Sequence, residues 1–217
     1  MAAVASPSAR TWVRRHPERG AYDRETIDAI LDEALICHLG FVHEGQPFVI
    51  PTIHARDGDL LYLHGSPASR MLRTLADGVD VCVTATLLDG IVLARSVYNH
   101  SMNYRSAVVL GRARRVDDRD EKLAGLERIV EHVVPGRTRD ARPPNDKELK
   151  GTLLLALPLD EASAKVRSGP PSDFDDDLGL PIWAGVLPLQ VVPGAAEADP
   201  GSVNGVPLPE YVARYRR

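Results

Sequence analysis

The chain has few of the residues on which several common classes of protein depend. Its 217 residues include two cysteines, and aromatic side chains make up 5% of the composition. Because Cys37 and Cys82 lie in apolar segments, we expect buried free thiols in a reducing compartment rather than a disulfide framework. No apolar run approaches the roughly 20 residues of a membrane-spanning helix, so no membrane partner is expected. The first ten residues lack a secretory signal pattern, and the expected location is the cytoplasm.

Motifs for nucleotides, metals and nucleic acids are missing as well. No G-x-G-x-x-G or Walker-type loop is present, which argues against a Rossmann dinucleotide domain and an NTPase. The seven histidines are scattered, without H-E-x-x-H or paired-cysteine spacing, so no metal site is predicted. Since binding to a phosphate backbone needs a dense positive surface, the formal net charge of -4 argues against nucleic acid as a partner.

What is present is the pattern of one globular domain. Hydrophobic residues make up 44% of the chain and charged residues 26%, which are ordinary values. Short apolar segments separated by turn residues predict strands at 37–42, 47–55, 60–64, 79–87, 91–94, 104–116 and 152–157. Helical spacing predicts helices after Asp23, at 68–76, from Asp118 or Asp120 to Val133, and at 146–150. This order predicts a mainly β fold of the α+β class, a β-barrel with peripheral helices.

The segment 60–73 is the most informative in the chain. It reads as a strand that breaks at a glycine and restarts as a helix. Ser66 suits the N-cap and Pro67 the first helical position, so free backbone N–H groups and the positive end of the helix dipole are expected to face an anion. Arg70 and Arg73 are placed to bind phosphate oxygens from nearly one face of that helix. A capped surface helix with solvated arginines is the alternative that this segment leaves open.

A polar loop, 96–104, lies between two predicted strands and is nominated as the substrate side; the alternative is that its residues satisfy one another in a long surface loop. His100 in this loop and His64 at a strand end are able to exchange protons near neutral pH. Neither belongs to a Ser-His-Asp or Cys-His arrangement, so no catalytic residue is assigned.

Several further segments occur in an order that is typical of one family. They are RHPERG at 15–20, LGF at 39–41, QPFVIPT at 46–52, the helix start at 66–73, NYRS at 103–106, GRA at 111–113 and WAGVLPL at 183–189. In this order they resemble the flavin-binding split β-barrel proteins related to pyridoxamine 5'-phosphate oxidase. The similarity covers roughly residues 14–190 and is greatest to the flavin-nucleotide-binding subfamily, which has nitroimidazole-resistance relatives.

The resemblance implies a split β-barrel at 14–190, with a flexible N-terminal tail at 1–13 and an extended C-terminal tail at 191–217. It also implies a homodimer with FMN at the interface. The residues it assigns to the flavin are Val49, Ile50, Pro51 and Thr52 along the ring system, His64 and Gly65 at the strand end beneath it, Ser66, Ser69, Arg70 and Met71 in the phosphate-binding turn, Tyr104, Arg105 and Ser106 on a neighbouring strand, and Trp183 near the ring. Many relatives carry lysine where this chain has Met71, so the phosphate charge is expected to rest on Arg70 and Arg105.

The implied function is that of an FMN-dependent oxidoreductase acting on a small acceptor, whose identity the sequence does not give. Three alternatives stay open at this point. The first is a flavin-binding storage protein without catalysis. The second is a haem-binding split barrel, for which His64 and His100 are the candidate axial ligands. The third is a deazaflavin protein, which the absence of a lysine at Met71 leaves open.

Overall fold

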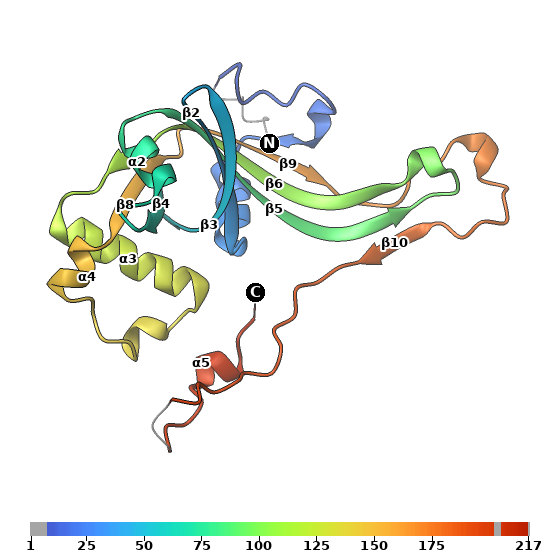
Figure 1. Ribbon diagram of the computed structural model, residues 1–217. Helices are drawn as coiled ribbons and strands as arrows, with labels where there is room; N and C mark the ends of the chain where they lie inside the picture. The colour runs from blue at the N-terminus through green and yellow to red at the C-terminus, as the bar shows by residue number, and fades with distance from the viewer. Residues whose placement is uncertain (1–7, 202–204, 217) are drawn as a thin grey trace.

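The computed structural model describes residues 8–201 and 205–216, and its framework is an antiparallel sheet of ten strands (Figure 1). Neighbouring strands follow the order β1-β9-β6-β5-β2-β3-β4-β8-β7, and β10 pairs with β5. The strands are β1 (Gly20–Ala21), β2 (Ile36–His43), β3 (Gln46–Asp57), β4 (Leu60–Gly65), β5 (Asp80–Leu93), β6 (Ser101–Arg112), β7 (Arg114–Arg115), β8 (Leu153–Pro158), β9 (Glu161–Arg167) and β10 (Gly185–Pro188). The α-helices are α1 (Arg24–Glu33), α2 (Arg70–Ala76), α3 (Arg119–Val133), α4 (Asp146–Lys150) and α5 (Glu210–Ala213). The 3-10 helices are η1 (Pro17–Arg19), η2 (Val97–Asn99), η3 (Arg137–Arg139) and η4 (Asp175–Asp177).

The curled sheet encloses the main hydrophobic core, and the prediction of a mainly β fold with peripheral helices is confirmed. Alternate residues of the strands point inward, as the period of two requires. The largest buried side chains of this core are Ile27, Ile30, Leu31, Leu39, Leu61, Leu63, Leu72, Leu75, Leu155, Leu157 and Leu159. A second core lies under α3, where Ile129 packs on Tyr62 and Leu154. Within the described part of the chain, no helix is both long enough and apolar enough to cross a membrane.

Strands β5 and β6 continue beyond the barrel as a long hairpin (Figure 1). The part beyond the Leu88–Tyr104 pair, with residues 94–100, is called the arm here. The predicted break between two strands at 89–90 is wrong, because the sheet absorbs these residues as a bulge between Leu88 and Gly90 and the strand continues. The segment 168–184 connects β9 to β10 and contacts the arm through Asp173. The Asp173 carboxylate accepts from the Arg95 backbone N–H at 2.8 Å and from the Arg95 guanidinium at 2.7 Å.

The described residues of both terminal segments contact the barrel domain. Residues 1–7 of the predicted flexible tail lie outside the described residues, but 8–13 pack against the sheet: Thr11 is buried, and Trp12 stacks on Tyr22 with 6.0 Å between ring centroids. The described part of the C-terminal segment lacks regular structure up to α5, and its end contacts α3 and η3. There the Tyr211 hydroxyl accepts from Arg137 at 3.1 Å, and Tyr215 donates to the Val133 carbonyl at 2.8 Å.

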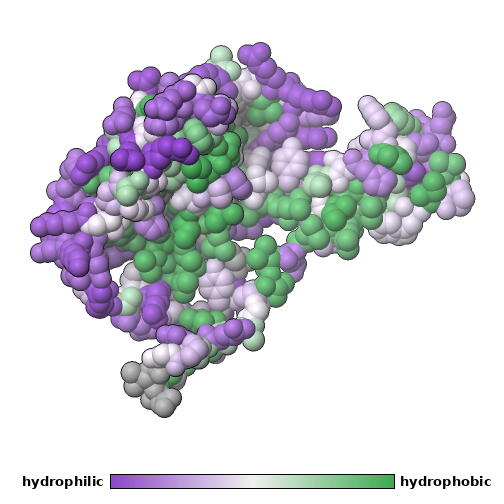
Figure 2. Space-filling model, in the orientation of Figure 1, coloured by the Kyte–Doolittle hydropathy of each residue, from purple (hydrophilic) through white to green (hydrophobic). Residues whose placement is uncertain are grey.

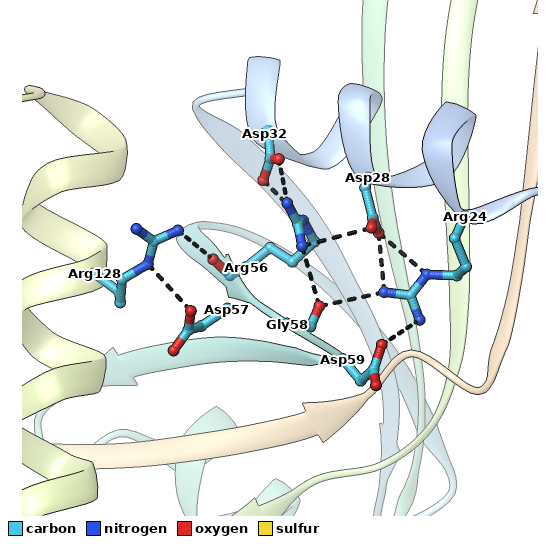
Figure 3. Close-up of polar contacts among 8 residues, drawn as sticks. All are labelled: Arg24, Asp28, Asp32, Arg56, Asp57, Gly58, Asp59 and Arg128. Atoms are coloured by element: carbon cyan, nitrogen blue, oxygen red, sulfur yellow. Dashed lines mark hydrogen bonds and ion pairs between the residues drawn. The ribbon is translucent and has the colours of Figure 1, made fainter.

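A network of arginines and aspartates joins α1 and α3 to the turn between β3 and β4 (Figure 3). Arg56 of β3 donates to Asp32 at 2.9 Å and to the Gly58 carbonyl at 3.1 Å. Arg24 of α1 donates to the same carbonyl at 3.3 Å, while Arg128 of α3 donates to the Arg56 carbonyl at 3.1 Å. The hydrogen bond with Asp32 is the main reason that the pKa of Arg56 is raised. These contacts hold both helices in place on the paired part of β3 and β4.

The close approach of α3 to the sheet depends on Gly125. A Cβ at this position would lie 2.7 Å from Cδ2 of the fully buried Leu154 and 3.3 Å from the Tyr62 ring. We therefore expect Gly125→Ala to lower the free energy of unfolding by about 1 kcal/mol, since overpacking exceeds the gain in helix propensity. Urea denaturation measures the change. Gly179→Ala is the control, because no atom lies within 4 Å of its Cβ position. Equal stability of Gly125→Ala and the parent protein would contradict a rigid contact between α3 and the sheet.

Candidate functional site

The candidate site begins where β3 and β4 separate. Residues 54–57 of β3 pair with 60–63 of β4, and the pairing stops at His54 and Leu63. The next residues of β4, His64 and Gly65, pair with Leu154 and Leu153 of β8 on their other side. Among the described strands, β3 from Gln46 to Ile53 pairs with β2 alone. One edge of this segment therefore offers backbone N–H and C=O groups to a ligand.

Seven of the predicted flavin residues lie around this gap, which we call the β3–β4 opening. The open edge of β3 carries Val49, Ile50, Pro51 and Thr52, and the end of β4 carries His64 and Gly65. Arg70 reaches the same strand, because its guanidinium carbon lies 4.2 Å from the centre of the Phe48 ring. The structure thus brings the predicted ring-facing strand and a cation together.

The turn at 66–69 between β4 and α2 differs from the prediction. Ser66 accepts from the Ala68 N–H at 3.1 Å, and its carbonyl accepts from the Ser69 N–H at 2.9 Å, so it closes a separate turn. The N-cap of α2 is Ser69, whose hydroxyl accepts from the Leu72 N–H at 3.4 Å. The assignment of Ser66 as N-cap and Pro67 as first helical residue is wrong by one turn. Ser66 and Ser69 are three residues apart, and a serine at either position can cap a helix. Because Leu72 is buried in the core, the first turn of the helix is the one that contains Leu72, and Ser69 is its cap.

Met71 points into the protein rather than toward a phosphate. Its side chain is 7% exposed and packs in the main core. An apolar residue suits this position because a lysine ammonium would need to leave the core to stay hydrated. The cations on the exposed surface of α2 are Arg70 and Arg73.

Arg105 does not lie beside Arg70, and the predicted pairing of the two on one phosphate is wrong within a single chain. The Arg70 guanidinium lies over Phe48, which is level with Val81 of β5, whereas Arg105 pairs with Leu87. Six residues along a strand span about 20 Å. The sequence motif NYRS gives no information on this separation, because the register of the sheet sets it.

The Arg105 side chain instead lies between two carboxylates. It donates to Glu33 of α1 at 2.8 Å and to Asp89 of the β5 bulge at 2.8 and 3.0 Å. Hydrogen bonds with Glu33, and then with Asp89, raise the pKa of Arg105 further above its ordinary value. This arrangement is a structural clamp between α1 and the base of the arm.

The other residues of the predicted site lie away from the opening. Tyr104 and Ser106 belong to β6, which β5 and β2 separate from β3, at about 4.8 Å per strand. Ser106 donates to the Lys165 carbonyl of β9 at 3.3 Å. Trp183 is 69% exposed and precedes β10 beside the arm, with its ring over Gly185. Within one chain these three residues do not reach the open edge of β3.

His64 has its side chain in a second site, which we call the His64 pocket. The pocket has a volume of about 800 Å³ and lies between the end of β4, α3 and the segment 137–144. Six of its thirteen lining residues are apolar, and its charged residues are the basic Arg137 and Arg142 and the acidic Glu127, Asp140 and Glu148. The lining residues are His64, Leu126, Glu127, Ile129, Val130, Arg137, Thr138, Asp140, Ala141, Arg142, Pro143, Pro144 and Glu148. Sequence reasoning missed this pocket, although Pro143 and Pro144 follow a helix whose Val130 side chain is left exposed.

The chemistry of the His64 pocket follows from burial. Burial lowers the pKa of His64, so the imidazole is neutral at pH 7 and keeps a lone pair for a metal or a proton. The Nδ1 atom is buried without a hydrogen-bond partner among the described residues. His100, the other histidine of interest, is exposed at the base of η2, where its Nδ1 atom lies 2.8 Å from the Ser96 carbonyl. The polar loop predicted to face a substrate is the tip of the arm.

Comparison with known proteins places this architecture in a family. The sequence profile of the pyridoxamine 5'-phosphate oxidase family matches residues 23–166, and the chain belongs to this family. Its fold is the split β-barrel expected from the resemblance. Among curated proteins, none matches the chain.

Two solved structures are similar over almost the whole chain. The flavocytochrome Anf3 of Azotobacter vinelandii is 42% identical, with a TM-score of 0.92 over 98% of this chain and 99% of that one. A FAD- and haem-binding protein of Mycobacterium smegmatis is 38% identical, with a TM-score of 0.86 over 90% and 96% of the two chains. A candidate 5-nitroimidazole antibiotic resistance protein of Bacteroides thetaiotaomicron is 28% identical, with a TM-score of 0.56 over 68% and 86%.

The clamp around Arg105 leads to a prediction about stability. Arg105→Met leaves the Glu33 and Asp89 carboxylates facing each other, so we expect the free energy of unfolding to fall by about 1 kcal/mol. The loss is this small because all three side chains are partly exposed, and solvent screens their charges. Adding Glu33→Gln and Asp89→Asn should recover most of the loss in urea denaturation. Arg112→Met, which breaks a more exposed pair with Asp80, is the control and should lose less. If Arg105→Met keeps its stability but loses affinity for the phosphate of a flavin nucleotide, Arg105 is a phosphate ligand rather than part of a structural clamp.

Proposed function

We propose that the protein binds a flavin nucleotide and a haem and passes electrons to a small acceptor. The observation that carries the proposal is the His64 pocket, a cleft with a neutral imidazole beside the β3–β4 opening. It occurs in a chain that matches a flavocytochrome and a FAD- and haem-binding protein over nearly their whole lengths. The expectation of FMN alone is thereby widened to a flavin nucleotide together with a haem.

The β3–β4 opening fits a flavin. The unpaired edge from Val49 to Thr52 offers hydrogen bonds to the heteroatoms of a flat ring system. Arg70 stands beside Phe48 at one end of the opening, where the phosphate common to FMN and FAD would be held, and the turn with Ser66 and Ser69 precedes it in the chain. A bound flavin supplies hydride and single-electron transfer, whereas these residues bind and orient it.

The His64 pocket fits a haem. Its apolar lining residues, such as Leu126, Ile129 and Pro143, suit a porphyrin, and a neutral imidazole is a common axial ligand. Arg137 and Arg142 are the cations that would face the propionates, although Arg142 is paired with Glu148 at 2.8 Å. A bound haem supplies one-electron chemistry at its iron. Since the His64 backbone borders the opening and its ring lines the pocket, the end of β4 separates the two proposed sites.

The proposal is tested by reconstitution with hemin, FMN and FAD. We expect a yellow flavin spectrum and, with hemin, a shifted Soret band. His64→Ala should weaken hemin binding by more than about tenfold, because loss of a ligand exceeds loss of an outer-shell partner, which costs 10 to 100-fold. His100→Ala is the matched control and should bind hemin normally.

Added imidazole should restore the spectrum of His64→Ala, which separates loss of the ligand from loss of the fold. Unchanged hemin binding by His64→Ala would contradict the assignment. Turnover with NADH or NADPH and an acceptor distinguishes an oxidoreductase from a flavin store.

We also propose that a second copy of the chain completes the flavin site. Along the arm, apolar residues are exposed to solvent (Figure 2), including Val97 at 92%, Tyr98 at 83% and Trp183 at 69%. Exposed apolar surface of this extent marks an interaction surface. A twofold partner would bring Tyr104, Ser106 and Trp183 toward the opening of the other chain, which accounts for their distance from it within one chain.

The dimer is tested by light scattering at micromolar concentration. We expect the mass of two chains for the parent protein and of one chain for Val97→Asp/Tyr98→Asp, since two buried carboxylates oppose association at the arm. The flavin affinity of this variant should fall together with its mass. Ala124→Asp, an exposed change on α3, is the control and should remain dimeric. A monomeric parent protein would contradict the proposal.

A further inference from the structure

Helices α2, α3 and α4 lie on one side of the barrel (Figure 1). A second large cleft is lined by residues of all three helices. We call it the α2–α4 cleft; its volume is about 980 Å³. Pro67 belongs to its wall, so it adjoins the turn at 66–69 that borders the β3–β4 opening. Its floor is apolar, because Val116, Leu149 and Leu153 are buried there. None of the sites described above includes this cleft.

The rim of the α2–α4 cleft carries an excess of positive charge. Five basic and three acidic residues line it: Arg73, Arg115, Arg119, Lys122 and Lys150, and Asp77, Asp117 and Asp146. This excess contrasts with the formal net charge of -4 for the whole chain. An excess of one sign of charge in a cleft raises the local concentration of ligands of the other sign.

Two of these cations are paired and three are not. Arg115 pairs with Asp117 at 2.7 Å and Arg119 with Asp146 at 3.1 Å. Arg73, Lys122 and Lys150 make no side-chain hydrogen bond or ion pair with any residue at 8–201 or 205–216. Burial, and then the charge of Arg115, lower the pKa of Lys122, so this ammonium is only partly compensated by the protein.

We propose that the α2–α4 cleft binds a nucleoside diphosphate. The apolar floor would take the base and sugar, while Arg73, Lys122 and Lys150 would bind the phosphate oxygens. One source of this ligand is the ADP half of a flavin dinucleotide whose inner phosphate lies at the turn 66–69; this case rests on the proposed flavin site. The other source is a free nucleotide.

The test compares two lysines of one helix. Lys150 lines the cleft, whereas Lys147, three residues earlier on α4, does not. Affinities for ADP, FAD and FMN are measured by calorimetry for Lys150→Gln, Lys122→Gln and the control Lys147→Gln. We expect each cleft variant to lose about tenfold in affinity for ADP and FAD, since one charge-assisted contact is removed, with FMN unaffected. Lys147→Gln should resemble the parent protein.

The outcomes separate the two sources and the two proposals. A loss for FAD supports the dinucleotide, and a loss confined to ADP supports a free nucleotide. The inference is overturned if the parent protein does not bind ADP and the ratio of FAD to FMN affinity stays the same in all variants. Should FMN and FAD fail to bind while ADP binding depends on Lys122 and Lys150, the flavin proposal fails and the cleft assignment stands.

Discussion

The divergence of β3 and β4 beyond the His54–Leu63 pair determines the layout of the whole molecule. If the two strands stayed paired, the barrel would close, and both the edge of β3 and the end of β4 would be used in hydrogen bonds to each other. Because β4 turns to β8 alone, the backbone of β3 from Gln46 to Ile53 keeps one edge open. The same turn directs the His64 ring toward α3. One change in strand pairing therefore creates two neighbouring sites.

The paired part of the β3–β4 hairpin has to be rigid so that the unpaired edge of β3 keeps a fixed position for a ligand. The arginine network centred on Arg56 attaches α1 and α3 to the turn between the strands (Figure 3). Gly125 lets α3 approach the sheet, which places Ile129 on the floor shared by the second core and the His64 pocket. Surface ion pairs contribute little individually, but several that share partners hold an orientation better than one.

At the other end of the barrel, β5 and β6 belong partly to the barrel and partly to the arm. Up to Leu87 and Arg105 their inward residues belong to the core. Beyond the bulge, Val92 and Asn103 are still buried, whereas Met102 and the tip residues Val97 and Tyr98 are exposed. The clamp formed by Arg105, Glu33 and Asp89 lies at this boundary and fixes the direction in which the arm leaves. Arg105 thus has a structural partner on each side, where the family resemblance had suggested a phosphate.

Local patterns in the sequence were enough for the elements and the fold class. Apolar alternation and turn residues such as Glu44-Gly45 predicted the hairpins of β2, β3 and β4, and Asp23 and Asp118 cap helices as predicted. Errors came where two local solutions compete, as with Ser66 and Ser69, or where a polar strand such as β9 lacks a strong pattern. The ordered motifs identified the family correctly, because each reflects a conformation set by a few adjacent residues.

The sequence by itself determined that the chain forms capped helices and most of its strands in this order, and the family resemblance assigned Val49 to Thr52, His64 and Arg70 to one site. Only the tertiary structure decided that Arg105 lies about 20 Å along the sheet from the level of Phe48, over which Arg70 lies. It also decided that Met71 is buried and that α3 and the segment 137–144 border His64. The reason is physical. Capping and alternation depend on neighbours within a few residues, whereas register, the face a side chain takes and the walls of a pocket depend on contacts between segments far apart in the chain.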